Sequence, residues 1–140
     1  MAEPGMLAEP DEAPKPAPWQ PPAALREVAE LDFDRAERRG YPEAVYCESK
    51  TPAQLRLIAA AVREKSARTM FTRASPEQAE AVLAELPDAG RDGEARLLWW
   101  PAEPPAETGG LVVIAAAGTS DLPVAREAQL VARFLGRRTE

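Results

Sequence analysis

The sequence predicts an α/β protein: a small domain of alternating helices and strands, followed by the first strand and helix of a second, parallel sheet. Two helix starts of the same design, TPAQ at 51–54 and SPEQ at 75–78, each follow a short apolar segment of strand type. They are spaced by the length of one β-α unit, which favours parallel strands joined by crossover helices. A later apolar run at residues 111–117, LVVIAAA, has the composition of a parallel strand buried on both faces.

The composition narrows the chemistry open to this chain. It has 140 residues, with 17 Lys and Arg against 23 Asp and Glu, one Cys and no His. A net charge of −6 gives no support for nucleic-acid binding. Without His, a Ser-His-Asp triad and every His-containing zinc site are excluded, and one Cys excludes an intrachain disulfide or a thiolate metal cluster. No apolar run is long enough to cross a bilayer, so a cytoplasmic protein that contacts neither nucleic acid nor membrane is expected.

Residues 1–22 are expected to be a disordered, proline-rich leader. They contain seven of the 15 prolines and no apolar stretch of the kind that a signal peptide needs. A ligand for a proline-recognising domain around Trp19 is the alternative. Order is expected from Ala23, where apolar residues at helical spacing predict one continuous helix that ends at Gly40. These apolar positions are Leu25, Ala29, Phe33 and Ala36.

The rest of the N-terminal domain, residues 23–100, repeats one pattern. Short strands are predicted for AVYC at 44–47, TMFT at 69–72 and ARLLWW at 95–100. Each of the two helices between them has Thr51 or Ser75 at the N-cap, Pro at the first helical position and Gln three residues after the cap. This arrangement predicts two capping boxes. PAEPPAETGG at 101–110 is interpreted as a linker.

The GTSD turn at 118–121 is the one motif that points to chemistry. It lies between the apolar 111–117 strand and a predicted helix at 122–135, whose apolar stripe is Val124, Ala128, Val131 and Leu135. Such a strand-turn-helix junction presents free backbone amides and the positive end of the helix to an anion. Gly118 permits close approach, Thr119 and Ser120 offer hydroxyls, and Asp121 can accept from a ribose hydroxyl. The alternative is an ordinary turn in which Ser120 or Asp121 caps the helix.

Three motifs in this order resemble the LarB family of nickel-pincer cofactor biosynthesis. The first covers residues 31–54, the second is TRA at 72–74, and the third is AAGTSDLPVA at 116–125. The third motif is similar to the first strand and turn of PurE, the aminoimidazole ribonucleotide mutase of purine synthesis. The resemblance therefore implies that residues 111–140 are the opening unit of a flavodoxin-like (PurE-like) nucleotide-binding domain, incomplete in this sequence.

The resemblance also implies an activity and a site. LarB-type enzymes carboxylate the pyridinium ring of nicotinic acid adenine dinucleotide with CO2 or bicarbonate, after a cysteine thiolate has added to the ring. They then hydrolyse the phosphoanhydride, without a covalently bound cofactor. The residues that match the nucleotide- and phosphate-binding turn are Gly118, Thr119, Ser120 and Asp121. Lys50, Arg35 and Arg73 match basic positions and are candidate substrate-binding residues. The alternative for each is a surface or interdomain salt bridge.

The sequence departs from the family at the catalytic residues. The family's late cysteine, its histidine-containing loop and its glycine-rich loops have no counterpart in these 140 residues. Cys47 falls in the first motif, and we expect it to be a small buried side chain with no catalytic or metal-binding role. The sequence is therefore expected to be a truncated form that is inactive alone, with a homo-oligomer or a complementing C-terminal chain as the expected partner. The alternative is a non-enzymatic nucleotide-binding or protein-interaction module.

Overall fold

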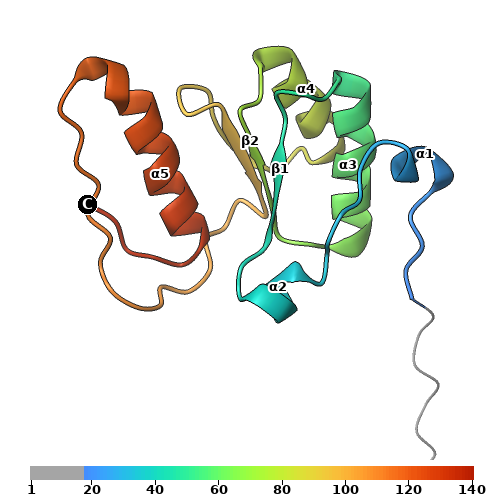
Figure 1. Ribbon diagram of the computed structural model, residues 1–140, viewed down its shortest axis with the longest axis horizontal. Coiled ribbons are helices and arrows are strands. Elements are labelled where there is room, and N and C mark those ends of the chain that lie inside the picture. The colour runs from blue at the N-terminus through green and yellow to red at the C-terminus, as the bar shows by residue number, and fades with distance from the viewer. Residues whose placement is uncertain (1–17) are drawn as a thin grey trace, which may run out of the picture.

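A four-stranded sheet forms the centre of the protein in the computed structural model, which describes residues 18–140 (Figure 1). The strand order is β1-β2-β4-β3, and β1 (Glu43–Tyr46) pairs in parallel with β2 (Thr69–Thr72). β4 (Leu97–Trp100) is antiparallel to both β2 and β3 (Gly90–Asp92). The predicted α/β class is confirmed, and the predicted parallel crossover holds for β1 and β2.

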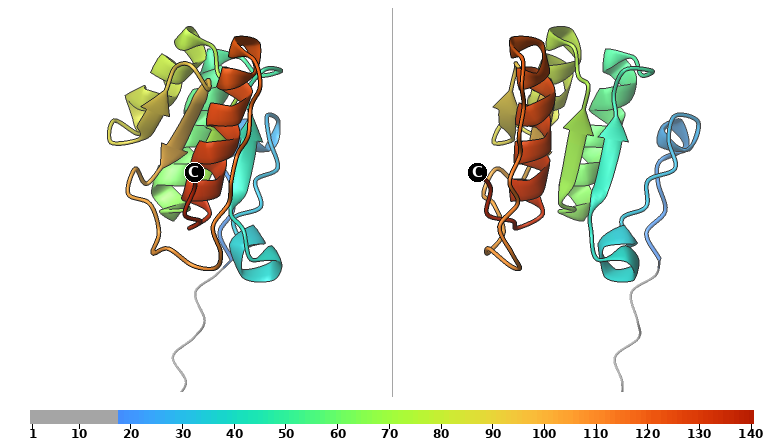
Figure 2. Two further views of the ribbon diagram at one scale, coloured as in Figure 1. Left: turned by 90° about the vertical axis from the view of Figure 1, so that its left-hand side faces the viewer. Right: turned by 60° about the vertical axis from the view of Figure 1, so that its left-hand side comes forward.

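Helices cover both faces of this sheet. α3 (Pro52–Lys65) and α4 (Pro76–Glu85) lie on one face, and α5 (Leu122–Phe134) lies on the other (Figure 2). The side chains of β2 alternate between the two layers, since Phe71 joins the core beneath α3 and α4 whereas Met70 joins the cluster around Phe134 of α5. The protein is thus built as three layers, with α5 as the outer layer on its own side.

Both predicted capping boxes are present, and they confirm the two helix starts. The hydroxyl oxygen of Thr51 accepts from the Gln54 amide at 3.2 Å, and that of Ser75 accepts from the Gln78 amide at the same distance. The second box does more than cap its helix. The buried side chain of Gln78 also donates to the backbone carbonyls of Cys47, at 2.9 Å, and of Lys50, at 2.6 Å. α4 therefore holds the turn between β1 and α3 in place.

The single helix predicted from Ala23 to Gly40 is wrong. The structure has two short helices, α1 (Ala23–Arg26) and α2 (Arg35–Arg39), with an irregular segment between them. Gly40 does end α2, in the left-handed conformation with φ 78°. The apolar side chains of the irregular segment all pack against the core, which one helix of 3.6 residues per turn cannot arrange. These side chains are Val28, Ala29, Leu31 and Phe33.

Residues 1–17 of the predicted leader lie outside the described residues, whereas Trp19 packs on the domain. Its ring meets that of Phe33 edge-on, with centroids 5.1 Å apart, and its indole N–H donates to Glu64 at 3.2 Å. Lys65 lies 5.4 Å from the same ring. The chain therefore contacts the core before the first helix begins.

The strand predicted at 95–100 belongs to a hairpin that the sequence analysis missed. β3 lies between the predicted helix that starts at Ser75 and the predicted strand, and it pairs with β4 in antiparallel register. The hairpin turn is closed by the carboxylate of Asp92, which accepts from the Ala95 amide at 2.9 Å. The sheet therefore continues beyond β2 with antiparallel strands.

The buried central strand predicted at 111–117 is also wrong for this structure. Only Val112 forms a bridge, in parallel with Thr139, and Val113 is 68% exposed. A two-sided parallel strand needs neighbours at both edges and helices on both faces, and the described residues supply one bridged neighbour and one helix. The following helix is confirmed as α5, but its predicted stripe is packed only in part. Val131 packs against the cluster around Phe134, whereas Val124 is 62% and Leu135 is 41% exposed. Across residues 18–140, no helix is both long and apolar enough to span a membrane.

We predict that Gln78→Ala destabilises the fold by about 2–4 kcal/mol, because it removes one half of a capping box and leaves two carbonyls without their donor. Gln54→Ala is the matched control, since Gln54 closes the same kind of box on α3 and is expected to cost about 1 kcal/mol. Urea unfolding followed by circular dichroism measures both values. Equal losses in the two variants would show that the bonds to Cys47 and Lys50 contribute nothing.

Candidate functional site

The carboxyl ends of the two parallel strands and the amino ends of three helices lie at one end of the molecule (Figure 1). Lys50 follows β1, Arg73 follows β2, and Arg96 lies in the turn of the β3–β4 hairpin at the same end. We call Lys50, Arg73 and Arg96 the cationic edge. Open α/β sheets bind ligands at the carboxyl ends of their parallel strands, so this is the position where a ligand is expected.

Two arginines of the cationic edge have a left-handed backbone. Arg73 has φ 59° and Arg96 has φ 54°, a conformation that is uncommon outside glycine. The two residues are tied together, because the Arg96 guanidinium donates to the carbonyls of Arg73, at 2.8 Å, and of Ala74, at 3.2 Å. The Ala74 amide donates back to the Arg96 carbonyl at 3.0 Å. Such residues gather at functional sites, where the surrounding contacts hold an unfavourable backbone in place.

Arg73 also joins the cationic edge to α5. Its Nε lies 3.7 Å from Oε2 of Glu127, and its side chain remains 49% exposed. In the same region, Arg126 of α5 donates to Asp92 at 2.5 Å. Hydrogen bonds from Arg126 and from the Ala95 amide lower the pKa of Asp92 despite its partial burial, which by itself acts in the opposite direction. These two ion pairs fasten the amino-terminal half of α5 to the sheet.

The charges of the cationic edge affect the pKa values of Tyr46 and Cys47, at the end of β1. The hydroxyl of Tyr46 donates to the carboxylate of Glu48, which raises the tyrosine pKa, while Arg73 and Arg96 oppose that shift. Burial raises the pKa of Cys47 from 9.0 to about 11, although Lys50 and Arg96 act in the opposite direction. Cys47 is completely buried, so its thiol is protonated at neutral pH and out of reach of solvent.

A cavity of about 240 Å³ lies beside the cationic edge. It runs between the start of α4 and the hairpin turn, and its polar lining comes from Ser75, Arg91, Asp92 and Arg96. A larger hollow of about 710 Å³ lies elsewhere, lined by Trp19, Phe33 and Lys65 among others, and none of the predicted site residues lines it. None of the predicted site residues lines the smaller cavity either, but Arg96 of the cationic edge does, and so does Ala74, which follows Arg73 in the chain.

The predicted nucleotide-binding turn opens α5 and is fully accessible. Thr119–Asp121 form a 3-10 turn, and Gly118, Thr119, Ser120 and Asp121 are all exposed. Neither Ser120 nor Asp121 caps α5, contrary to the alternative interpretation of this turn; Ser120 donates instead to Asp121 at 3.4 Å. A Cβ added at Gly118 would meet nothing nearer than 3.6 Å. The Asp121 amide donates to the Gly118 carbonyl at 3.1 Å, the Leu122 amide donates to the Thr119 carbonyl, and Pro123 has no amide, whereas the amides of Thr119 and Ser120 form no backbone hydrogen bond with a described residue.

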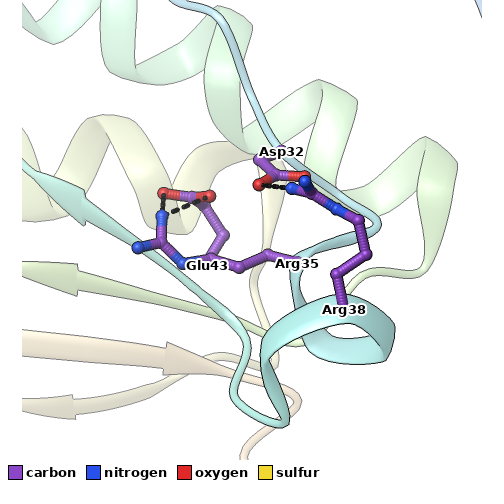
Figure 3. A network of polar contacts seen from close by, with 4 residues as sticks. All are labelled: Asp32, Arg35, Arg38 and Glu43. Atoms are coloured by element: carbon purple, nitrogen blue, oxygen red, sulfur yellow. Dashed lines mark hydrogen bonds and ion pairs between the residues drawn. The ribbon is translucent and has the colours of Figure 1, made fainter.

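Arg35 is not part of the cationic edge. It lies at the amino end of β1, where its Nη1 is 3.3 Å from the carboxylate of Glu43 (Figure 3). Its guanidinium is also 5.2 Å from the centre of the Tyr41 ring. Hydrogen bonds to Tyr41 and then to Glu43 raise the pKa of Arg35. Asp32 and Arg38 form a second ion pair beside it (Figure 3). For Arg35 the structure shows the salt bridge that was the alternative to substrate binding.

Arg96 is the functional candidate that the sequence analysis missed. Its proximity to Arg73 depends on the antiparallel pairing of β2 with β4, for which the sequence contains no local signal. Within residues 18–140, no group of three or more His, Cys, Asp or Glu side chains could hold a metal ion.

Comparison with protein families identifies the domain. The sequence model of the LarB/PurE-like N-terminal domain matches residues 24–102, more than half of the chain. This chain belongs to the LarB family. The matched region contains all of the cationic edge and Arg35, and the GTSD turn lies after it. No curated protein matched the chain in a sequence search.

We predict that Cys47 of this LarB-family protein reacts at least about a hundredfold more slowly with a thiol reagent at pH 8 in the native state than in urea, because only the exposed thiolate reacts. Labelling followed by mass spectrometry measures both rates, and Cys47→Ala confirms that no other group is labelled. Rapid labelling of the native protein would contradict the buried, protonated state of this thiol.

Proposed function

We propose that this protein acts in the carboxylation of nicotinic acid adenine dinucleotide, as the dinucleotide-holding part of a LarB-type synthase. The observation that carries the proposal is the match of the LarB/PurE-like N-terminal domain to residues 24–102. That match supports a relation to carboxylases of this family, and the substrate is inferred from the resemblance of the motifs. The GTSD turn, with its similarity to the nucleotide-contacting turn of PurE, supports the choice of a nucleotide.

The charges of the dinucleotide suit the cationic edge. Its two phosphates and its nicotinate carboxylate are anionic, and Lys50, Arg73 and Arg96 offer three cations at one end of the sheet. The amides of Thr119 and Ser120 in the exposed GTSD turn can donate to a phosphate at the amino end of α5. Glu127, the partner of Arg73, comes six positions after Asp121, and six positions correspond to about 9 Å along a helix. One dinucleotide can reach from this turn to the cationic edge.

The reaction itself needs a group that Cys47 does not supply. Carboxylation joins a ring carbon to CO2 and releases the ring proton, and the family activates the ring with a cysteine thiolate. Hydrolysis then adds water across the phosphoanhydride and releases AMP. Because Cys47 is buried with a raised pKa, we propose that this chain binds and orients the dinucleotide and that the nucleophilic thiol comes from another polypeptide segment. The same burial favours a non-enzymatic dinucleotide-binding module as the second candidate.

Binding of nicotinic acid adenine dinucleotide to the purified chain tests the first part of the proposal. We predict that Arg73→Ala and Lys50→Ala each weaken binding about tenfold or more, because each removes a charge-assisted hydrogen bond worth about 1.5–3 kcal/mol. Isothermal titration calorimetry measures the affinities. Arg63→Ala is the matched control, since Arg63 is an exposed arginine on α3 that pairs with Glu85 away from the cationic edge. Absence of binding, or equal losses in all three variants, would refute the proposal.

Turnover tests the second part. With the dinucleotide and bicarbonate, we expect the purified chain to form neither carboxylated product nor AMP, as measured by mass spectrometry. Turnover that disappears in Cys47→Ala would overturn the assignment of the thiol to another segment. Binding without turnover supports the division of roles proposed above.

A further inference from the structure

The cavity of about 240 Å³ between the start of α4 and the β3–β4 hairpin has an apolar floor. The floor is formed by Ala74, Ala79, Leu97 and Leu98, and none of these residues is more than 4% exposed. Pro76, in the first turn of α4, adds an apolar wall. All of the lining residues belong to the LarB/PurE-like N-terminal domain, so this domain alone forms the cavity.

Two arginines of the hairpin lie at the rim of this cavity. Nη1 of Arg91 donates to Glu80 of α4 at 2.6 Å, and the side chain of Arg91 is 35% exposed. Arg96 uses Nε and Nη2 to donate to the carbonyls of Ala74 and Arg73. A guanidinium has five N–H donors in one plane, so each arginine keeps donors for a ligand. Because these bonds already hold both side chains, ordering them on binding costs less entropy.

The charge of the lining disfavours a cation. Asp92 contributes the one carboxylate among the lining residues, and its oxygens are already bound by Arg126, at 2.5 Å, and by the Ala95 amide, at 2.9 Å. A cationic ring in the cavity would therefore lie beside Arg91 and Arg96 without a free carboxylate as its partner. Transfer of a charge from water to an apolar floor is costly unless the charge is paired. The cavity suits an uncharged group.

The volume of the cavity suits a single ring system. Pockets for drug-sized ligands measure about 300–1,000 Å³, so the smaller space here can take one part of a dinucleotide. A flat ring over the apolar floor would lie beside guanidinium groups, which stack on aromatic faces. Of the two rings in nicotinic acid adenine dinucleotide, adenine is uncharged at neutral pH, whereas the nicotinate ring is a pyridinium cation. Adenine is therefore the better fit.

We propose that this cavity binds the adenine of nicotinic acid adenine dinucleotide, so that the N-terminal domain holds the AMP half; this inference rests on the proposed function. Arg91 stacks on the purine ring. Arg96 lines the cavity and also belongs to the cationic edge, and Ala74 of the floor directly follows Arg73. The adenylate phosphate thus lies at the cationic edge, and the nicotinate half extends toward the GTSD turn.

The burial of Cys47 supports this division of the dinucleotide. The nicotinate ring has to meet a thiol from another polypeptide segment, because Cys47 is completely buried. A ring enclosed by the N-terminal domain could not reach that thiol. The AMP half takes no part in carboxylation, and hydrolysis of the phosphoanhydride releases it as the leaving group. A separate adenine site therefore orients the dinucleotide and leaves the reacting ring accessible.

Isothermal titration calorimetry of the full chain with three fragments tests the proposal. We expect AMP to bind at least about tenfold more tightly than ribose 5-phosphate, because a stacked base adds to the affinity of the phosphate. We also expect AMP to bind at least about tenfold more tightly than nicotinic acid mononucleotide. AMP binding no tighter than that of either other fragment would overturn the adenine site.

The whole dinucleotide, titrated in the same way, separates this inference from the proposed function. A chain that binds the dinucleotide and prefers nicotinic acid mononucleotide to AMP would refute the adenine site and leave the proposed function standing. A chain that binds AMP but not the dinucleotide would refute the proposed function and leave the adenine site standing.

Substitutions of Arg91 test its role beside the ring. We expect Arg91→Ala and Arg91→Lys each to reduce the preference for AMP over ribose 5-phosphate about fivefold or more, since lysine keeps the charge but not the planar group that stacks. Arg56→Ala is the matched control, because Arg56 is an exposed arginine of α3 that pairs with Glu85 at 3.6 Å. Circular dichroism checks that each variant is folded. Full retention of the preference in Arg91→Lys would show that Arg91 acts by charge alone and would overturn the stacked arrangement.

Photolabelling locates the base directly. We expect 8-azido-AMP to label residues in the segments 74–79 or 91–98, as mapped by mass spectrometry of peptides. An excess of AMP should prevent this labelling, and an excess of nicotinic acid mononucleotide should not. Labelling confined to other segments would overturn the proposal.

Discussion

The carboxamide of Gln78 is the interaction on which the candidate site depends. Its oxygen accepts from the Ser75 amide at 2.8 Å, and its nitrogen donates to the carbonyls of Cys47 and Lys50. One buried side chain thereby joins the start of α4 to the turn that follows β1. Lys50 belongs to that turn, and Arg73 lies two residues before Ser75, the N-cap of α4. The carboxamide of Gln78 therefore sets the position of Lys50 relative to Arg73. A buried polar group whose bonds are all formed favours one arrangement of its neighbours over any other.

α5 packs between the four-stranded sheet and the short ladder formed by residues 112–114 and 138–140. Its amino-terminal half is fastened by the Arg73–Glu127 and Arg126–Asp92 ion pairs, and its carboxyl-terminal half is buried through Phe134. The same helix has the short 112–114 and 138–140 ladder on its other side. The position of the GTSD turn relative to the cationic edge follows from these contacts.

Burial of Cys47 separates ligand binding from covalent chemistry in this LarB-family protein. The thiol lies at the end of β1, where the charges of Lys50 and Arg96 act to lower its pKa and so favour the thiolate. Desolvation outweighs them, since the side chain is completely buried and its pKa rises to about 11. Cations near a sulfur atom are thus insufficient to activate it. At this end of the molecule the accessible groups include guanidinium, ammonium and hydroxyl groups that suit an anionic ligand, together with the carboxylates of Glu48, Glu94 and Asp121.

The sequence by itself determined the parts of this protein whose hydrogen-bond partners lie within a few residues. Both capping boxes and the left-handed stop at Gly40 were predictable, because Pro, Gln and Gly act on their own turn of the chain. The parallel β1–β2 pair and the position of α5 were predictable from longer patterns, the spacing of the β-α units and the apolar periodicity. Only the tertiary structure decided that the 23–40 segment splits in two, that β3 and β4 form a hairpin, and that Val124 stays exposed. It also brought Arg96 to Arg73 and placed Arg35 with Glu43. These outcomes depend on which distant surfaces meet, and apolar periodicity shows that a face can be buried without showing what covers it.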